Sequence, residues 1–152
     1  MKLIKFVNLK DQWQAEKSQL LPIIDKILSS GEFVGGKEID FFEKKIATYT
    51  KSKYAVALNS GTDALTFALH SVGVKKGDEV ITPANSYVAS TSSIVHLGGK
   101  PVFADVLPDQ NINPKEIERK ITKKTKAIMP VHLTGRSCKM DEIIKISKKY
   151  KI

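Results

Sequence analysis

The chain has 152 residues, of which 41% are hydrophobic and 27% are charged, and 25 basic against 16 acidic residues give it a formal charge of +9. This composition excludes a disordered or collagen-like chain, and a single cysteine excludes a disulfide scaffold. The length suffices for one domain with a hydrophobic core, and no apolar run reaches the roughly 18 residues that a membrane span needs.

The sequence also indicates a compartment. The N-terminal stretch MKLIKFVNLKDQWQ becomes polar too early for a signal peptide. The lone Cys138 fits a reducing environment, so we expect a cytoplasmic protein with no membrane partner.

Most of the positive charge lies in the last quarter of the chain. Residues 115–152 carry 12 basic and 4 acidic residues, a net of +8, whereas residues 1–114 carry 13 and 12. Only Arg119 and Arg136 offer the guanidinium fork that suits phosphates and bases, and no aromatic residues alternate with the lysines. We therefore expect a solvated lysine-rich face and no nucleic-acid partner. A basic anion-binding module is the less favoured alternative.

The first part of the chain is expected to be helical. Apolar residues recur at helical spacing over residues 11–30, where Pro22 disturbs the middle, and again over residues 39–49. Glycines separate the two helices. We expect residues 1–36 to form an N-terminal helical segment and residues 37–152 to belong to a larger α/β domain.

After this segment, short apolar runs alternate with helical patterns. Strands are expected at residues 54–58, 79–82, 101–106 and 127–133, and helices at residues 62–72, 87–97, 113–121 and 140–150. Strands separated by helices imply a mainly parallel open sheet with helices on both faces. Ligands of such sheets bind beyond the carboxyl ends of the strands.

The most informative motif is the stretch of residues 59–64 (NSGTDA), which joins an expected strand to an expected helix. The first amides of a helix lack internal partners and favour an anion. Gly61 lets a ligand approach the backbone, and the Ser60 and Thr62 hydroxyls add donors. However, Ser60 and Asp63 also fit a capping box that merely starts the helix. From the residues alone, both interpretations stay open.

A second motif, residues 82–90 (TPANSYVAS), follows the next expected strand and should lie on the same edge of the sheet. Its Tyr87 stands near an expected helix start, where an aromatic ring can lie flat on a planar heterocycle. Ordinary packing is the simpler explanation when this residue is taken alone.

Together these motifs resemble the DegT/DnrJ/EryC1/StrS family. The stretches that match, in order, are GEFVGGKEIDFFE, NSGTDAL, GDEVITPANSYVAS, FADV and PVHLTG. The family consists of aminotransferases of the aspartate aminotransferase fold (fold type I) that use pyridoxal 5′-phosphate. The resemblance implies that residues 37–152 are an incomplete, truncated large domain. It also implies a nucleotide-linked keto-sugar as acceptor, an amino donor such as glutamate, and a homodimer.

The resemblance assigns cofactor-binding roles to particular residues. By it, Gly61, Thr62 and Asp63 correspond to the turn that holds the cofactor phosphate, and Tyr87 corresponds to the aromatic residue that stacks on the cofactor ring. Ser60 and Ser90 lie in matching motifs and are also expected to bind the cofactor. Asp105 and His132 match recurrent positions of the family, and no chemical step is assigned to them.

One residue differs from the family pattern, and the histidines do not have the spacing of a metal site. Thr134 stands where the family commonly has an aromatic residue. The three histidines lack metal-ligand spacing, so no metal is expected.

The resemblance places the catalytic groups outside these residues. The lysine that forms the Schiff base and the aspartate that pairs with the pyridine nitrogen are expected beyond Ile152, so no catalytic residue is assigned here. We therefore expect an N-terminal fragment that is inactive alone. A sugar dehydratase with histidine in place of the lysine and a non-catalytic regulatory relative of the same fold remain alternatives.

Overall fold

The computed structural model describes residues 4–152. The chain divides into two compact units, Met1–Ala57 and Leu58–Ile152. This division differs from the domain boundary expected after residue 36, which stays a prediction for the intact protein. Within the described residues, no helix combines the length and the apolar character needed to cross a membrane.

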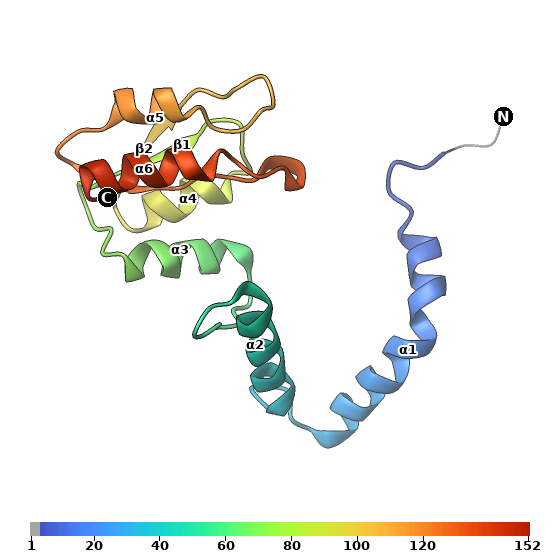
Figure 1. The fold of residues 1–152 in the computed structure, drawn as a ribbon. Helices are drawn as coiled ribbons and strands as arrows, with labels where there is room; N and C mark the ends of the chain where they lie inside the picture. The colour runs from blue at the N-terminus through green and yellow to red at the C-terminus, as the bar shows by residue number, and fades with distance from the viewer. Residues whose placement is uncertain (1–3) are drawn as a thin grey trace. The chain divides into compact units, whose positions relative to one another are not determined.

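The first unit consists of helices α1 (Leu9–Ser30) and α2 (Lys37–Thr50), as the helical spacing predicts (Figure 1). Helix α1 ends at Gly31, whose φ of 72° is the left-handed conformation that glycine adopts without a steric cost. Pro22 lies inside α1, which is continuous through it. Neither helix contains a buried residue.

The strand expected at residues 54–58 is wrong, because this segment forms neither a strand nor a helix. Tyr54 and Val56 are 74% and 76% exposed. A hydrogen bond from the Ala57 amide to Glu43 Oε1, at 2.7 Å, connects this segment to α2. A strand needs a hydrogen-bonded neighbour, and no described strand pairs with this segment.

The second unit is built on a parallel three-stranded sheet of order β2-β1-β3. Its strands are β1 (Glu79–Pro83), β2 (Lys100–Ala104) and β3 (Thr125–Ile128). The parallel pairing confirms the expected α/β class. The central strand β1 is buried along its whole length. Strand β3 is shorter than expected at its carboxyl end, because the chain leaves the sheet after Ile128 and forms the 3-10 turn η1 (Leu133–Gly135).

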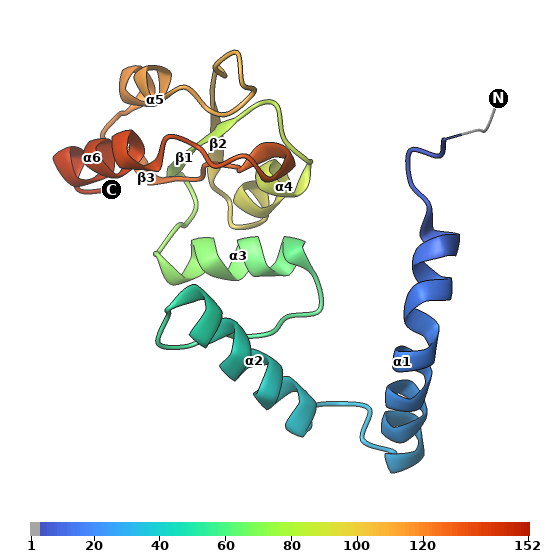
Figure 2. The same ribbon diagram turned by 45° about the vertical axis from the view of Figure 1, so that its right-hand side comes forward.

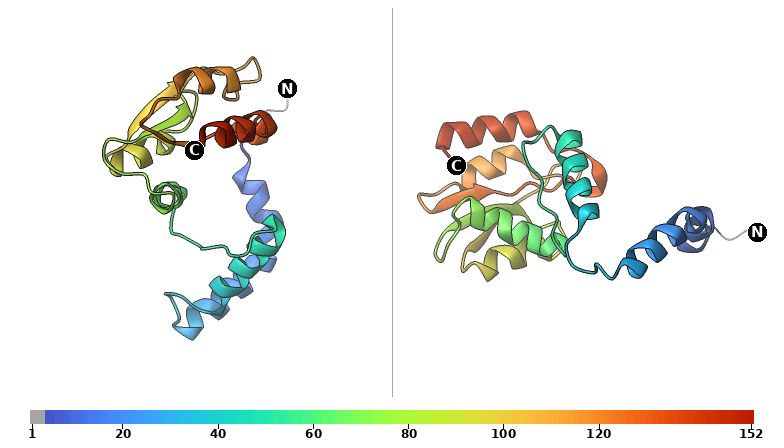
Figure 3. Two further views of the ribbon diagram at one scale, coloured as in Figure 1. Left: turned by 60° about the vertical axis from the view of Figure 1, so that its left-hand side comes forward. Right: turned by 90° about the horizontal axis from the view of Figure 1, so that it is seen from below.

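Four helices cover the sheet: α3 (Gly61–Ser71), α4 (Ala89–His96), α5 (Pro114–Lys120) and α6 (Met140–Tyr150). Helices α3 and α4 pack side by side, as do α5 and α6 (Figures 2 and 3). Helix α5 begins as predicted, because Asn113 Oδ1 accepts from the Lys115 amide at 3.0 Å and Pro114 occupies the first helical position.

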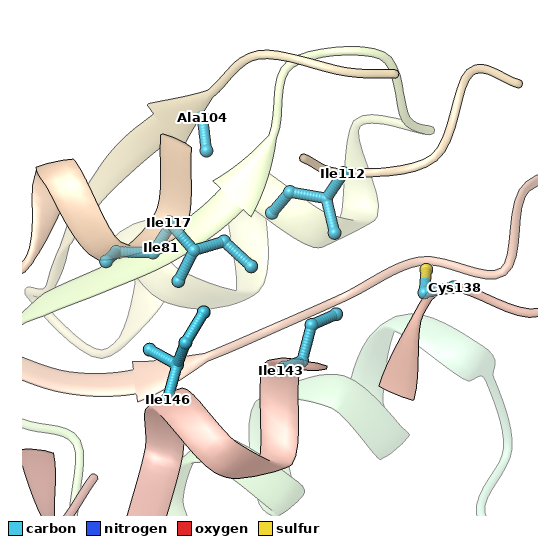
Figure 4. Close-up of a cluster of buried hydrophobic side chains, with 7 residues drawn as sticks. All are labelled: Ile81, Ala104, Ile112, Ile117, Cys138, Ile143 and Ile146. Atoms are coloured by element: carbon cyan, nitrogen blue, oxygen red, sulfur yellow. The ribbon is translucent and has the colours of Figure 1, made fainter. Parts of the chain in front are cut away.

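Consecutive residues of β1 pack into two separate cores, since successive side chains of a strand point to opposite faces. Val80 packs in the cluster that contains Leu69 of α3 and Ile94 of α4. Ile81 packs in the cluster of the α5 and α6 face, which Figure 4 shows with Ile143 among its members. Each fully buried aliphatic side chain contributes about 1.5–3 kcal/mol. The two cores hold helices on both faces and so fix the carboxyl edge of the sheet.

Candidate cofactor-binding site

The start of α3 is an N-terminal cap that leaves two amides free. Ser60 Oγ accepts from the Asp63 amide at 3.1 Å, and the Ala64 amide bonds to the Ser60 carbonyl at 3.0 Å. Within residues 4–152, the amides of Gly61 and Thr62 have no hydrogen-bond acceptor. These free donors and the helix dipole together favour an oxyanion at this position.

The space in front of these amides is open. A Cβ built on Gly61 would meet no atom within 4 Å, so the backbone is accessible to a ligand from this side. The Thr62 hydroxyl has no partner in the described part of the chain and is half-buried beside the two amides. The turn therefore fits a phosphate group without a basic side chain.

Asp63 is already engaged within the cap. Its amide bonds to Ser60, and its Oδ2 accepts from Ser60 Oγ at 2.9 Å. The side chain therefore fixes the turn, and its assignment to the cofactor stays a prediction. Both interpretations of this motif are physically compatible, because the cap uses one set of amides and leaves another.

Tyr87 lies in the loop that leaves the carboxyl end of β1. Helix α4 begins at Ala89, so the expected start at residue 87 is wrong and Tyr87 precedes the helix. Its side chain is 78% exposed. A ring that is neither packed nor bonded presents its face to a planar ligand, and its assignment to the cofactor ring stays a prediction.

Ser90 is buried, unlike Tyr87. Its hydroxyl lies 2.7 Å from the Ser86 hydroxyl, so this pair holds the loop against the first turn of α4. Its assignment as a cofactor ligand stays a prediction, and a role in shaping the Tyr87 loop needs no ligand.

Two further residues lie at the ends of the neighbouring strands. Asp105 follows β2, where its Oδ1 accepts from the Val106 amide at 2.8 Å and its carbonyl accepts from Asn113 at 2.9 Å. It thus stabilises a turn. His132 follows β3, and its Nδ1 accepts from the Cys138 amide at 3.1 Å. Thr134, which departs from the family pattern, has a φ of 53° inside η1.

Cys138 is a structural residue in this unit. Its thiol is buried and donates to the Val131 carbonyl at 3.1 Å. Desolvation by burial raises the pKa of this thiol, which disfavours the nucleophilic thiolate. In the described range, no group of three or more His, Cys, Asp or Glu side chains is arranged to hold a metal ion.

Sequence reasoning missed two buried polar residues near this edge. Asn111 is 1% exposed and binds the η1 loop through its side chain. Thr82, near the carboxyl end of β1, is fully buried, and its hydroxyl lacks a partner among the described residues. Asn111 lies outside every motif, and Thr82 opens the second motif without a role assigned to it, because burial of both residues arises from packing between distant segments.

Comparisons with known proteins agree with the fold and show the family. The model of the DegT/DnrJ/EryC1/StrS aminotransferase family matches residues 14–152. A dTDP-3-amino-3,6-dideoxy-alpha-D-galactopyranose transaminase from Aneurinibacillus thermoaerophilus is 40% identical over 99% of this chain and 42% of its own length. A UDP-2-acetamido-2-deoxy-3-oxo-D-glucuronate aminotransferase from Pseudomonas aeruginosa is 38% identical with the same coverage. The chain thus spans less than half the length of these relatives.

Solved structures superpose on the whole chain. The structure of DesV from S. venezuelae, in complex with a ketimine intermediate, matches with a TM-score of 0.95 and 33% identity over 100% of this chain and 41% of its own. The structure of NtdA from Bacillus subtilis with bound cofactor PMP matches with a TM-score of 0.94 and 36% identity, and the match covers 100% of this chain and 35% of NtdA. The expected fold type I architecture is therefore confirmed.

Proposed function

The chain belongs to the DegT/DnrJ/EryC1/StrS aminotransferase family, and we propose that it is the cofactor-phosphate part of a sugar aminotransferase. The cofactor is pyridoxal 5′-phosphate. The intact protein transfers an amino group, donated by glutamate, to a keto group of a nucleotide-linked sugar. The names of the two transaminase relatives support a nucleotide-sugar substrate. A reducing cytoplasm is the compartment in which we expect this reaction.

The observation that carries this proposal is the pair of free amides at the start of α3. The amides of Gly61 and Thr62 would hold the phosphate, and the exposed ring of Tyr87 would stack on the heterocycle. When bound, the cofactor supplies the electron sink that amino transfer requires. The residues of this chain bind and orient the cofactor. By the family resemblance, we expect the lysine that forms the covalent bond beyond Ile152.

Cofactor titration tests this division of roles. We expect the 152-residue chain to bind pyridoxal 5′-phosphate more tightly than pyridoxal, since only the former carries the phosphate. We also expect borohydride reduction to leave no adduct at a specific lysine. Equal affinity for the two ligands contradicts the phosphate site, and a specific reducible lysine adduct contradicts the missing-lysine proposal.

The activity of the intact protein is tested separately. Incubation with a nucleotide-linked keto-sugar and glutamate should yield the amino sugar and 2-oxoglutarate in equal amounts. One relative, 37% identical over 97% of this chain, is called a pleiotropic regulatory protein of Geobacillus stearothermophilus. A non-catalytic regulatory function is therefore the second candidate. Cofactor binding without amino transfer by the intact protein favours that candidate.

The exposed helices of the first unit support a homodimer. Apolar side chains recur along α1 and α2, among them Ile23 at 54% exposure and Phe42 at 54% exposure, yet no residue of either helix is buried. Such faces are typical of surfaces that a partner subunit covers. Sedimentation of the intact protein at micromolar concentration should give a dimer, and a monomer contradicts this part of the proposal.

A further inference from the structure

His132 lies at the same edge of the sheet as Tyr87. Strands β1 and β3 are parallel neighbours, and the Met129 amide extends their pairing with a bond to the Ile81 carbonyl at 2.7 Å. Tyr87 stands four residues after the end of β1, and His132 stands four residues after the end of β3. Both side chains are exposed. Both residues follow the carboxyl ends of neighbouring parallel strands, which places them beyond the same edge of the sheet.

The imidazole of His132 is fixed in one tautomer. Its Nδ1 accepts a hydrogen bond from the Cys138 amide at 3.1 Å. A nitrogen that accepts a hydrogen bond carries no proton, so the proton of the neutral ring is on Nε2. The exposed end of the ring is therefore a donor, held in a defined direction by the backbone.

A buried side chain holds the loop that carries this imidazole. Asn111 Nδ2 donates to the carbonyls of Arg136 and Ser137 at 3.1 and 3.3 Å, and its Oδ1 accepts from the Leu133 amide at 3.1 Å. Among the described residues, every hydrogen bond of its side chain goes to this one loop. Since burying an amide side chain costs free energy unless its bonds are made, Asn111 is committed to the geometry of the loop.

We propose that His132 Nε2–H donates a hydrogen bond to an oxygen atom of the ligand bound at this edge, and that Asn111 is the positioning residue that aims it. This proposal rests on the proposed cofactor site. The family resemblance assigns no binding role to His132, and this proposal gives it one. The proposal also gives a positioning role to Asn111, which lies outside every motif of the sequence.

The tautomer is measured first, without ligand, by long-range ¹⁵N–¹H correlation NMR of the 152-residue chain. At a pH where the imidazoles are neutral, His132 should show an unprotonated Nδ1 and a protonated Nε2. His70 and His96 are exposed on helices with no side-chain hydrogen bond in the described structure, so they serve as internal controls and should show averaged tautomers. An averaged signal from His132 overturns the fixed-donor geometry.

Asn111→Asp tests the positioning role, because a carboxylate accepts from Leu133 but cannot donate to the two loop carbonyls. We expect His132 in this variant to give the averaged signal of the controls. Asn113→Ala is the matched control, since it removes the α5 cap from the same segment without touching the loop. An unchanged His132 signal in Asn111→Asp overturns the role of Asn111.

Two substitutions of the exposed histidine keep the proposal testable if Asn111→Asp does not fold. His132→Gln places an amide donor where Nε2 stands, whereas the shorter amide of His132→Asn reaches only the position of Nδ1 and leaves no donor at Nε2. Pyridoxal 5′-phosphate should bind about fivefold more weakly to His132→Asn and within about twofold of the unaltered affinity to His132→Gln. Equal effects of the two substitutions overturn the donor role.

The outcomes separate this inference from the proposed function. If the unaltered chain binds no pyridoxal 5′-phosphate, the cofactor site and the ligand contact of His132 both fail. The ligand-free NMR measurement still decides whether Asn111 fixes the tautomer. If the cofactor binds and His132→Asn binds it equally well, the cofactor site stands and the His132 contact is overturned.

Discussion

Gly61→Ala separates the stability of α3 from the affinity for a phosphate. Gly61 is the first residue of α3, its φ is not positive, and a Cβ at this position meets no atom within 4 Å. Alanine is a better helix former than glycine and restricts the unfolded chain, so the variant should gain about 0.5 kcal/mol of stability. The same methyl group would occupy the open space in front of the free amides.

The loss of affinity follows from the bonds that the methyl group displaces. A hydrogen bond to a charged group is worth about 1.5–3 kcal/mol, and each 1.4 kcal/mol is about a tenfold change in affinity. Losing one amide-to-phosphate bond should therefore weaken the binding of pyridoxal 5′-phosphate by about tenfold to a hundredfold. Calorimetric titration measures the affinity, and urea unfolding followed by far-UV circular dichroism measures the stability.

Gly77→Ala is the matched control with the opposite pattern. Gly77 precedes β1 at the amino end of the strand and has a φ of 91°, so an alanine there costs about 1–2 kcal/mol. Its affinity for the cofactor should not change. Unchanged affinity in Gly61→Ala would refute the phosphate site, and a loss of stability in that variant would refute the helix-start geometry.

Three further predictions concern buried or paired groups of the second unit. Thr82→Val should raise the free energy of unfolding by about 1 kcal/mol, because it replaces a buried hydroxyl that has no partner among the described residues. A lower free energy of unfolding, measured by urea titration, would mean that the hydroxyl is bonded. Cys138 should resist alkylation in the folded chain and react after unfolding, since it is buried and its pKa is raised; equal rates in the two states would contradict this burial. Glu118→Gln should lower the urea midpoint slightly at neutral pH, because Lys149 and Tyr150 bond to Glu118 and lower its pKa from 4.5, while Glu118 raises the pKa of Lys149 from 10.5. The stabilisation is present above the unfolded pKa of Glu118, is lost as the pH falls through its lower folded pKa, and is lost at the alkaline end as the pH rises through the raised pKa of Lys149. A difference between variants that does not depend on pH would contradict the pairing.

Elements that depend on local chemistry could be predicted from the sequence. Gly31 ends α1, Asn113 and Pro114 begin α5, and Ser60 caps α3, each through contacts within a few residues. The same locality made the free amides of α3 predictable, because a cap determines which donors remain. The six residues of this motif therefore suffice to predict the capped helix start, and phosphate binding there stays a prediction.

Elements that depend on distant partners could not be predicted in the same way. Residues 54–58 have the composition of a buried strand, but a strand forms only where a neighbour offers its backbone. The end of β3 was overestimated because the chain turns away after Ile128, where Asn111 binds a loop more than 20 residues along the chain. No pattern within either segment contains that information.

The cap and the proposed phosphate site at the start of α3 depend on each other. Without Ser60, the amide of Asp63 would lose its acceptor and the Asp63 carboxylate would lose the donor that offsets its charge beside a bound anion. With Ser60 in place, the donors left without partners in the described structure are those of Gly61 and Thr62, next to the position where no side chain intrudes. Ser60, which caps the helix, thus also determines which amides stay free for the ligand. A substitution of Ser60 should therefore lower stability and affinity together, whereas Gly61→Ala should lower affinity alone.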